Sequence, residues 1–203
     1  MRTLAAVFAM AFSAFLHAQT QEVPRVEVST GYAFTHISFP LNPDPLAGNG
    51  SGNLQGWSAS ATVNVNQWLG VTADFGGYYG SATGSSTFKP ANCVLCTGEA
   101  IGTVRNMHTF VAGPQFSWHD GKVTYFVHPL FGAAHVREEM VFFGLLPTIS
   151  TTSFCLMVGG GVDYTLSRHF AVRGKLDYFS TRILDHRFSN FRVSPGIVFR
   201  FGG

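Results

Sequence analysis

The stretch NFRVSPGIVFRFGG, residues 190–203, alternates between two sets of side chains. One set is apolar and comprises Phe191, Val193, Pro195, Ile197, Phe199 and Phe201, and the other comprises Arg192, Ser194, Gly196, Val198 and Arg200. A period of two is typical of a β-strand with one apolar and one polar face. The segment therefore predicts a strand, and the surroundings of Arg192 and Arg200 depend on what its polar face meets.

Seven other segments alternate in the same way, which gives eight expected strands. They are residues 26–37, 54–65, 68–80, 106–118, 122–135, 153–165, 169–180 and 191–201. The connections are short at 66–67, 119–121 and 167–168, and longer at 38–53, 81–105, 136–152 and 181–190. Outer-membrane barrels have short periplasmic turns and longer outer loops. The order predicts an all-β fold, an eight-stranded antiparallel up-and-down transmembrane β-barrel with both termini in the periplasm.

Residues 1–18, MRTLAAVFAMAFSAFLHA, have the pattern of a secretory signal peptide. Arg2 precedes an apolar run from Leu4 to Leu16, and the small Ala18 suits a cleavage position. The run is shorter than the ~20 residues of a spanning helix, which disfavours the alternative of an N-terminal anchor. We expect cleavage after Ala18 and one outer-membrane β-barrel domain over residues 19–203.

The composition argues against an ordinary water-facing surface. Charged residues make up 12% of the chain, against about 25% in an average soluble domain. A formal net charge of +2 gives no basic excess for nucleic acid. After the leader, no segment has the ~20 apolar residues of a membrane helix. A closed β-barrel is then the remaining way to cross a membrane, because every backbone group must be paired inside lipid.

Residue size separates a membrane barrel from a soluble lipocalin-like barrel, which alternates with the same period. The polar set is rich in small residues such as Ser29, Thr62 and Thr109, which fit a crowded lumen, whereas a water-facing surface is rich in Lys and Glu. The apolar set is large, and its aromatic members gather near strand ends. Trp68, Trp118, Tyr164, Phe170 and Phe201 lie near the short turns, and Trp57, Tyr79 and Tyr178 near the long loops. Two aromatic girdles indicate two lipid–water boundaries.

Eight charged residues share the polar parity, and we expect them to form a charge network in the lumen. They are Glu27, Asp74, Asp163, Arg173, Lys175, Asp177, Arg192 and Arg200. An eight-stranded lumen is only wide enough for side chains, so these charges must pair with one another. The expectation places Arg192 and Arg200 among all four acids. Glu27 begins the first strand and Arg200 ends the last, which makes Glu27–Arg200 the expected pair across the closing seam.

Three segments resemble the small outer-membrane β-barrel family, which includes the transmembrane domain of outer-membrane protein A and related eight-stranded barrels. They are the leader, RGKLDY at 173–178 and GIVFRF at 196–201. The resemblance covers nearly all of residues 22–203. It implies a location in the outer membrane of a Gram-negative-type envelope, with outer-membrane lipid and lipopolysaccharide as partners. It also implies that the barrel-insertion machinery reads an aromatic residue near the C-terminus, here Phe201.

We expect a non-enzymatic protein with an envelope-structural or surface-interaction role and no cofactor, metal or catalytic residue. A narrow channel for ions or very small solutes is the alternative, although a lumen filled by its own side chains disfavours a wide pore. A lipid A-modifying hydrolase is a further hypothesis, since His36 and Ser38 weakly resemble the His-x-Ser pair of lipid A deacylase barrels. Such a site needs an acid to orient the histidine. The sequence identifies none, so a polar strand end is favoured.

The three cysteines and one histidine receive structural interpretations. Cys93 and Cys96 form a Cys-x-x-Cys in the longest loop, and we expect a local disulfide there because exported proteins meet an oxidising environment. The pair alone supplies too few ligands for a metal. Cys155 and His128 fall on the lumen parity, and we expect a small buried residue and a hydrogen-bonded filler.

Three prolines interrupt the expected strands. Pro114, Pro129 and Pro195 lie mid-strand on the apolar parity. Each lacks the backbone N–H that a ladder needs, so each predicts a bulge, a strand end or a local register defect.

Overall fold

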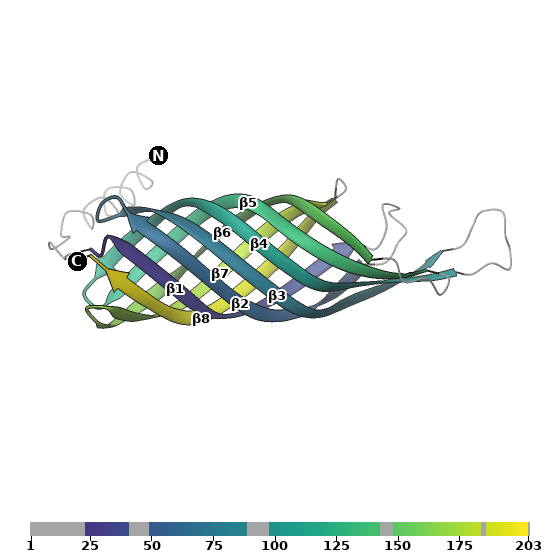
Figure 1. Ribbon diagram of the computed structural model, residues 1–203, viewed down its shortest axis with the longest axis horizontal. Coiled ribbons are helices and arrows are strands. Elements are labelled where there is room, and N and C mark those ends of the chain that lie inside the picture. The colour runs from purple at the N-terminus through teal and green to yellow at the C-terminus, as the bar shows by residue number, and fades with distance from the viewer. Residues whose placement is uncertain (1–22, 41–48, 89–97, 143–147, 184–185, 203) are drawn as a thin grey trace, which may run out of the picture.

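The computed structural model describes residues 23–40, 49–88, 98–142, 148–183 and 186–202. These residues form eight strands: β1 Val26–Pro40, β2 Asn49–Asn64, β3 Leu69–Phe88, β4 Gly98–Asp120, β5 Val123–Phe142, β6 Thr148–Ser167, β7 Phe170–Ile183 and β8 His186–Phe201. Neighbours in sequence are antiparallel neighbours in space, and β8 pairs with β1 to close the barrel (Figure 1). The eight-stranded up-and-down barrel predicted from the sequence is confirmed. Within the described ranges, no helix is long and apolar enough to span a membrane.

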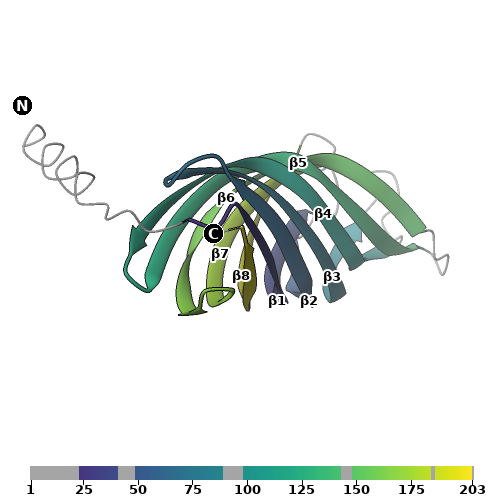
Figure 2. The same ribbon diagram turned by 60° about the vertical axis from the view of Figure 1, so that its left-hand side comes forward.

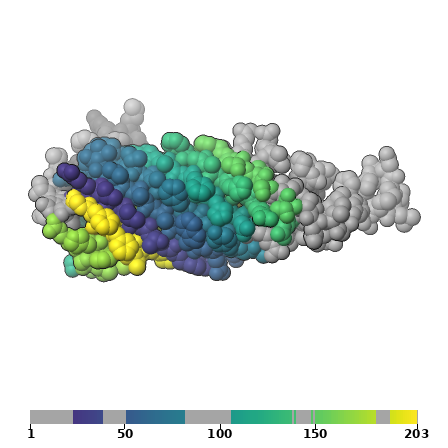
Figure 3. Space-filling view, in the orientation of Figure 1, coloured from purple at the N-terminus to yellow at the C-terminus, as the bar shows by residue number. Residues whose placement is uncertain are grey.

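The seam between the first and last strands is a regular antiparallel ladder. Glu27 pairs with Arg200 in register, and the purple β1 lies directly beside the yellow β8 (Figures 2 and 3). The paired residues, followed from Val26 around the barrel, return to β1 at His36 rather than at Val26. This stagger requires the strands to tilt relative to the barrel axis, as Figure 1 shows.

Local sequence chemistry forms the short turns. In the β2–β3 turn, the Asn66 side-chain oxygen accepts hydrogen bonds from the backbone N–H groups of Trp68 at 2.9 Å and Leu69 at 2.8 Å. Asparagine favours this kind of turn because its side chain mimics a backbone acceptor. In the β4–β5 turn, Gly121 has φ of 57°, a left-handed conformation that glycine adopts without steric cost. The strands end within a few residues of the predicted positions at this short-turn end.

At the opposite end the strands are longer than expected. Pairing between β3 and β4 continues through Thr83↔Thr103 to Phe88↔Gly98, so the predicted loop at 81–105 was too long. The predicted loops at 38–53, 136–152 and 181–190 were too long for the same reason. The alternation of apolar side chains ends where the outward surface stops being apolar. Strand pairing can continue past that point, because ladder hydrogen bonds need only the backbone. The β3–β4 hairpin therefore projects beyond the other strands (Figure 1).

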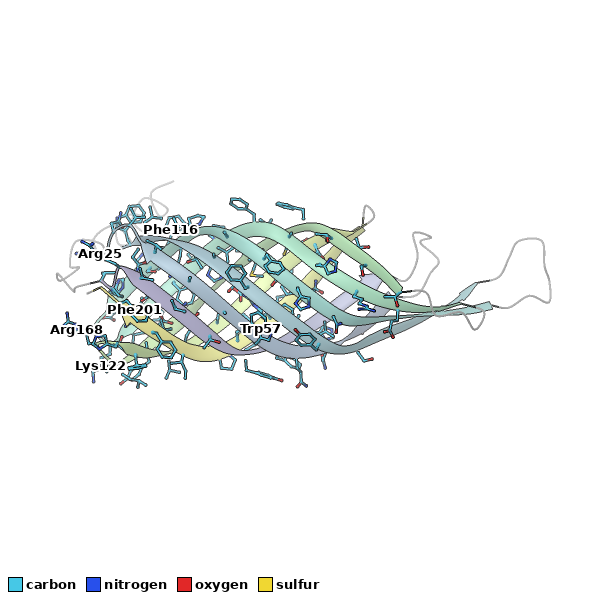
Figure 4. The ribbon with its side chains drawn as sticks, in the orientation of Figure 1. Arg25, Trp57, Phe116, Lys122, Arg168 and Phe201 are labelled. Carbon is cyan, nitrogen blue, oxygen red and sulfur yellow. The ribbon has the colours of Figure 1, made fainter. Side chains whose placement is uncertain are left out.

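The two faces of the barrel are assigned as predicted. Ser29, Thr62 and Thr109 are buried in the lumen, while large apolar side chains cover the outside. Predicted girdle residues that are exposed are Trp57, Trp68, Tyr79, Trp118, Tyr164, Phe170, Tyr178 and Phe201. In Figure 4, Phe201 lies at the short-turn end and Trp57 lies away from it along the barrel. The surface that faces outward is apolar over the middle of the barrel, which is the reverse of a soluble protein.

The prolines lie inside continuous strands, and none of them ends a strand or shifts the register. The β4–β5 ladder is interrupted between Ala112↔Phe131 and Phe116↔Val127 and resumes in the same register, which places Pro114 opposite Pro129. The β1–β8 ladder is interrupted in the same way at Pro195. The predicted bulges and register defects are therefore wrong at these positions, and only local pairs are lost.

The physical reason is that the backbone N–H and C=O of one strand residue both point toward the same neighbouring strand. Pro114 stays paired with Val71, Pro129 with Val158, and Pro195 with Gly174, each on its other side. Because Pro114 and Pro129 face each other, two missing donors fall at one place in one ladder. The strands also stay close there: a Cβ on Gly113 would lie 2.3 Å from the Pro129 carbonyl oxygen.

A closed barrel of this kind should be heat-modifiable. Residues 19–203, refolded in detergent, should migrate differently on a detergent gel before and after boiling, because an intact closed ladder resists the detergent until it is heated. Circular dichroism of the unboiled sample should be rich in β-structure. Identical migration together with a helical spectrum would contradict the barrel.

Candidate functional site

The lumen holds the charged residues that the sequence placed there. All eight are buried, and Arg200, the most exposed of them, has 7% of its surface accessible. They separate into two groups, each with two acids and two bases, so each group is formally neutral. The short-turn cluster comprises Glu27, Asp163, Arg173 and Arg200, and the central cluster comprises Asp74, Asp177, Lys175 and Arg192.

The short-turn cluster joins β1, β6, β7 and β8. Arg173 donates through Nε and Nη2 to the two carboxylate oxygens of Asp163, both at 2.7 Å. It also donates to Glu27 at 3.3 Å, and its guanidinium carbon lies 4.5 Å from the ring centre of Phe126. Arg200 Nε donates to Glu27 Oε1 at 3.0 Å, which is the pair expected across the seam. Bidentate arginine–carboxylate geometry gives this cluster both strength and a fixed orientation.

The central cluster crosses the lumen from β3 to β7 and β8. Arg192 donates through Nε to Asp177 at 2.8 Å, and through Nη1 to Asp74 at 2.8 Å and to the Tyr78 hydroxyl oxygen at 2.7 Å. Lys175 donates to the other oxygen of Asp74. Arg192 has no exposed surface. Its charge is balanced by two carboxylates within direct hydrogen-bond distance, those of Asp74 and Asp177.

One expectation needs correction. Arg192 and Arg200 do not share all four acids: Arg192 contacts Asp74 and Asp177, and Arg200 contacts Glu27 and Asp163. Both arginines lie on β8, and each residue of a strand advances the chain by about 3.3 Å. The two guanidinium groups consequently lie at different depths of the lumen and meet different partners.

Apart from Ala33 and Cys155, sequence reasoning missed the apolar part of the lumen. A buried cluster fills it and comprises Ala33, Ile37, Leu54, Tyr78, Met107, Val111, Leu130, Ala134, Val136, Cys155, Met157 and Phe179. Tyr78 and Phe179 stack with ring centres 6.4 Å apart. On β3 and β7 these residues follow Asp74 and Asp177 toward the end that carries the longer connections. The available signal was parity, because these residues lie on the same strand face as the lumen charges.

The lumen histidine and cysteine lie where they were predicted. His128 is buried, and its Nε2 lies 2.7 Å from Asp177 Oδ1. Cys155 is buried and is a free thiol. Cys93 and Cys96 lie outside the described residues, so their disulfide stays a prediction. Among the described residues, no group of three or more His, Cys, Asp or Glu side chains is arranged to hold a metal ion.

His36 and Ser38 lie on the exposed face of β1. His36 Nδ1 lies 2.8 Å from the side-chain oxygen of Asn53, and the Ser38 backbone N–H donates to Asn190 Oδ1 at 3.2 Å. An amide can orient an imidazole, but it carries no negative charge to stabilise the imidazolium formed in base catalysis. The contacts of His36 are those of a polar strand end.

Comparison with known proteins identifies a family. The family model described as "Outer membrane protein beta-barrel domain" matches residues 4–199. No curated protein sequence matches the chain. Among solved structures, the chain is similar to Ail, the attachment invasion locus protein of Yersinia pestis, with 20% identity, a TM-score of 0.54, and coverage of 87% of this chain and 99% of Ail. It is also similar to Neisserial surface protein A, with 15% identity, a TM-score of 0.57, and coverage of 89% and 100%.

The seam pair should show energetic coupling. Arg200→Leu removes one partner of a desolvated cluster, and we expect a loss of ~3–5 kcal/mol in the free energy of unfolding. Adding Glu27→Leu should recover part of this loss, because the remaining Asp163 and Arg173 form a neutral bidentate pair. The measurement is a double-mutant cycle by urea unfolding in lipid vesicles, with the exposed Arg137→Leu as the matched control. Strictly additive effects would show that Glu27 and Arg200 do not interact.

The polar strand end should carry no lipid chemistry. Expression of the chain should leave the mass of lipid A in the host cell unchanged, and His36→Ala with Ser38→Ala should change nothing further. Mass spectrometry of extracted lipid A makes the measurement. A mass shift on expression that the double substitution abolishes would establish the deacylase hypothesis instead.

Proposed function

Because the chain belongs to the outer membrane protein β-barrel domain family, we propose that it is a non-enzymatic outer-membrane barrel that acts by surface interaction. The observation that carries this proposal is the β3–β4 hairpin, which continues past the strands beside it. We place this end outside the cell and both termini in the periplasm, as the barrel architecture with short periplasmic turns suggests. The signal peptide over residues 1–18 belongs to the same proposal.

The hairpin presents a free strand edge. The β2–β3 register ends at Ser51↔Thr83, whereas β3 and β4 remain paired to Phe88↔Gly98. On the other side, the β4–β5 register ends at Ala100↔Phe142. The backbone of β3 after Thr83 therefore has β4 on one side and no barrel strand on the other among the described residues. Unpaired N–H and C=O groups along an edge accept an extended segment of a partner as an added strand.

The filled lumen supports an interaction role over the channel alternative. The short-turn cluster and the central cluster, each neutral, occupy two parts of the lumen. The part beyond them, toward the long connections, is occupied by Leu54, Leu130 and Phe179, which have no exposed surface. An ion on this path would have to displace paired charges and then cross an apolar layer. Both steps carry a desolvation cost. We infer that the barrel is a support for its outer end.

The outward surface supports three proposed partners. The apolar band between the two girdles suits outer-membrane lipid and lipopolysaccharide acyl chains. Phe201 ends β8 and is 54% exposed, so the barrel-insertion machinery has access to it. Among the described residues, the hydrogen-bond partners of His36 and Ser38 are amides and not carboxylates, which favours a non-enzymatic role over lipid A hydrolysis.

The plugged lumen predicts an electrically quiet barrel. In planar bilayers, the refolded chain should give no stable open-channel steps, because its own side chains close the path. Leu54→Ala combined with Phe179→Ala, which thins the apolar layer, should raise the frequency of brief openings relative to the unmodified chain. Sustained conductance by the unmodified chain would favour the channel alternative.

The proposed orientation and role can be tested on intact cells. A peptide tag inserted between residues 92 and 93 should bind antibody on intact cells, whereas a tag in the Gly121 turn should bind only after the outer membrane is permeabilised. Joining Ala82 to Val104, which are paired, through an Asn-Gly turn removes the projecting hairpin and suits a two-residue connection.

We expect expression of the full chain to change cell sedimentation and the retention of cells by an epithelial monolayer. The trimmed chain should stay heat-modifiable but should lose both effects. The reversed tag pattern would contradict the orientation. Equal behaviour of trimmed and full chains, both adherent above vector-only cells, would contradict the role of the hairpin.

A further inference from the structure

Three exposed cations lie at the short-turn end of the barrel. Arg25 directly precedes β1, Lys122 lies in the β4–β5 turn, and Arg168 lies in the β6–β7 turn, and all three are exposed. Figure 4 shows them at the same end as Phe201, around the rim rather than along the wall. We call Arg25, Lys122 and Arg168 the rim cations.

Backbone hydrogen bonds fix the segments that carry the rim cations. The Arg25 N–H donates to the Gly202 carbonyl at 3.3 Å, and the Arg25 carbonyl accepts from Asn64 N–H at 2.9 Å. The Lys122 carbonyl accepts from Thr165 N–H at 2.8 Å, which joins its turn to β6. Beside Arg168, the His169 carbonyl accepts from Arg200 N–H at 2.9 Å. The three side chains therefore start from fixed positions on one rim.

The rim cations lie at three of the four positions where the chain turns or ends at this rim. In barrel order they run from the β4–β5 turn through the β6–β7 turn to the start of β1, which lies beside the end of β8. The remaining turn, between β2 and β3, carries the uncharged Asn66 and Gln67. Asp120, exposed at the end of β4, is the acid of this rim among the described residues. Over the described residues, this rim therefore carries three exposed cations and one exposed acid, and its β2–β3 turn carries no charge.

The depth of the rim cations suggests their ligand. The outer wall next to the rim carries four exposed aromatic residues of the girdle, Trp118, Tyr164, Phe170 and Phe201. Aromatic girdles lie at the level of lipid headgroups. Cations placed just beyond such a girdle meet the phosphate layer of the lipid. Peptidoglycan lies farther from the bilayer, and nothing in the girdle positions these side chains for it.

We propose that the rim cations form a binding site for anionic glycerophospholipids, whose phosphodiester groups they hold at the start of β1 and at the β4–β5 and β6–β7 turns. The site selects lipid of net negative charge over zwitterionic lipid of the same chain length. Assignment of this lipid to the periplasmic leaflet rests on the orientation proposed above, but the site itself does not. Exposed cations attract anionic lipid only weakly, so we expect about a two- to five-fold local enrichment of anionic lipid beside them.

The tryptophans allow the test to be made one position at a time. The chain has three, Trp57, Trp68 and Trp118. One single-tryptophan chain keeps Trp57, at the opposite end, and a second keeps Trp68, beside the uncharged β2–β3 turn. In a third chain, all three tryptophans are replaced by Phe, and Phe170→Trp supplies the reporter. Phe170 is an exposed girdle residue two positions after Arg168.

Each single-tryptophan chain is refolded into phosphatidylcholine vesicles with a small fixed fraction of lipid that carries brominated acyl chains. The brominated lipid is either phosphatidylglycerol or phosphatidylcholine, and heat-modifiability verifies folding. Brominated phosphatidylglycerol should quench the Phe170→Trp reporter about two- to five-fold more than brominated phosphatidylcholine. The ratio should be close to one at Trp57 and smaller at Trp68 than at the Phe170→Trp reporter.

Charge removal completes the test. Arg25→Gln, Lys122→Gln and Arg168→Gln together should bring the ratio at the Phe170→Trp reporter to one, whereas Arg137→Gln, an exposed cation on β5 away from the rim, should leave it unchanged. High salt should weaken the preference of the unmodified rim, since exposed charges are screened. The salt measurement uses the unmodified rim and so does not require the triple variant to fold.

Two outcomes would overturn the proposal. One is an equal ratio at all three reporters or a ratio that the triple variant leaves intact. The other is cosedimentation with purified peptidoglycan that depends on the rim cations in the absence of phosphatidylglycerol enrichment, which would assign the rim to the cell wall. Both outcomes are independent of the hairpin and tag experiments on the outer end.

Discussion

Arg192 holds the centre of the barrel together, and the rest of the lumen is arranged around it. Its guanidinium has no exposed surface and joins Asp177 on β7 to Asp74 on the opposite wall. A charge in this position is tolerated only when its partners neutralise it and satisfy its donors. Lys175 donates to the second oxygen of Asp74, and His128 hydrogen-bonds to the second oxygen of Asp177. The same constraint repeats nearer the short turns, where Arg173 and Arg200 share Asp163 and Glu27.

Separation of the lumen into charged and apolar parts determines what the barrel leaves open for function. The interior is occupied by its own side chains, so the chemistry available to other molecules lies at the two ends and on the outward wall. The short-turn end carries exposed cations beside aromatic rings. The opposite end carries a hairpin whose backbone continues beyond its neighbours. A rigid barrel thus presents two different surfaces, separated by an apolar band.

The candidate site was only partly readable from the sequence. Parity placed Glu27 and Arg200 in the lumen, and ring closure put them opposite each other, so their contact followed from topology alone. The division into two clusters did not follow, because it depends on the depth of each side chain in a tilted barrel. Leu54 and Phe179 were missed for a different reason: apolar residues on a polar face look like exceptions until the volume they fill is known.

The sequence by itself determined the number of strands, their order, the face that carries the charges and the short turns, since period, turn chemistry and connection length are local properties of the chain. Tertiary structure alone decided how far β3 and β4 continue, because backbone pairing proceeds without an apolar signal. It also decided that Pro114 and Pro129 face each other, so that their two missing donors fall at one place in one ladder. Register and stagger fix which side chains meet across the lumen, and both arise only when eight strands close on one another.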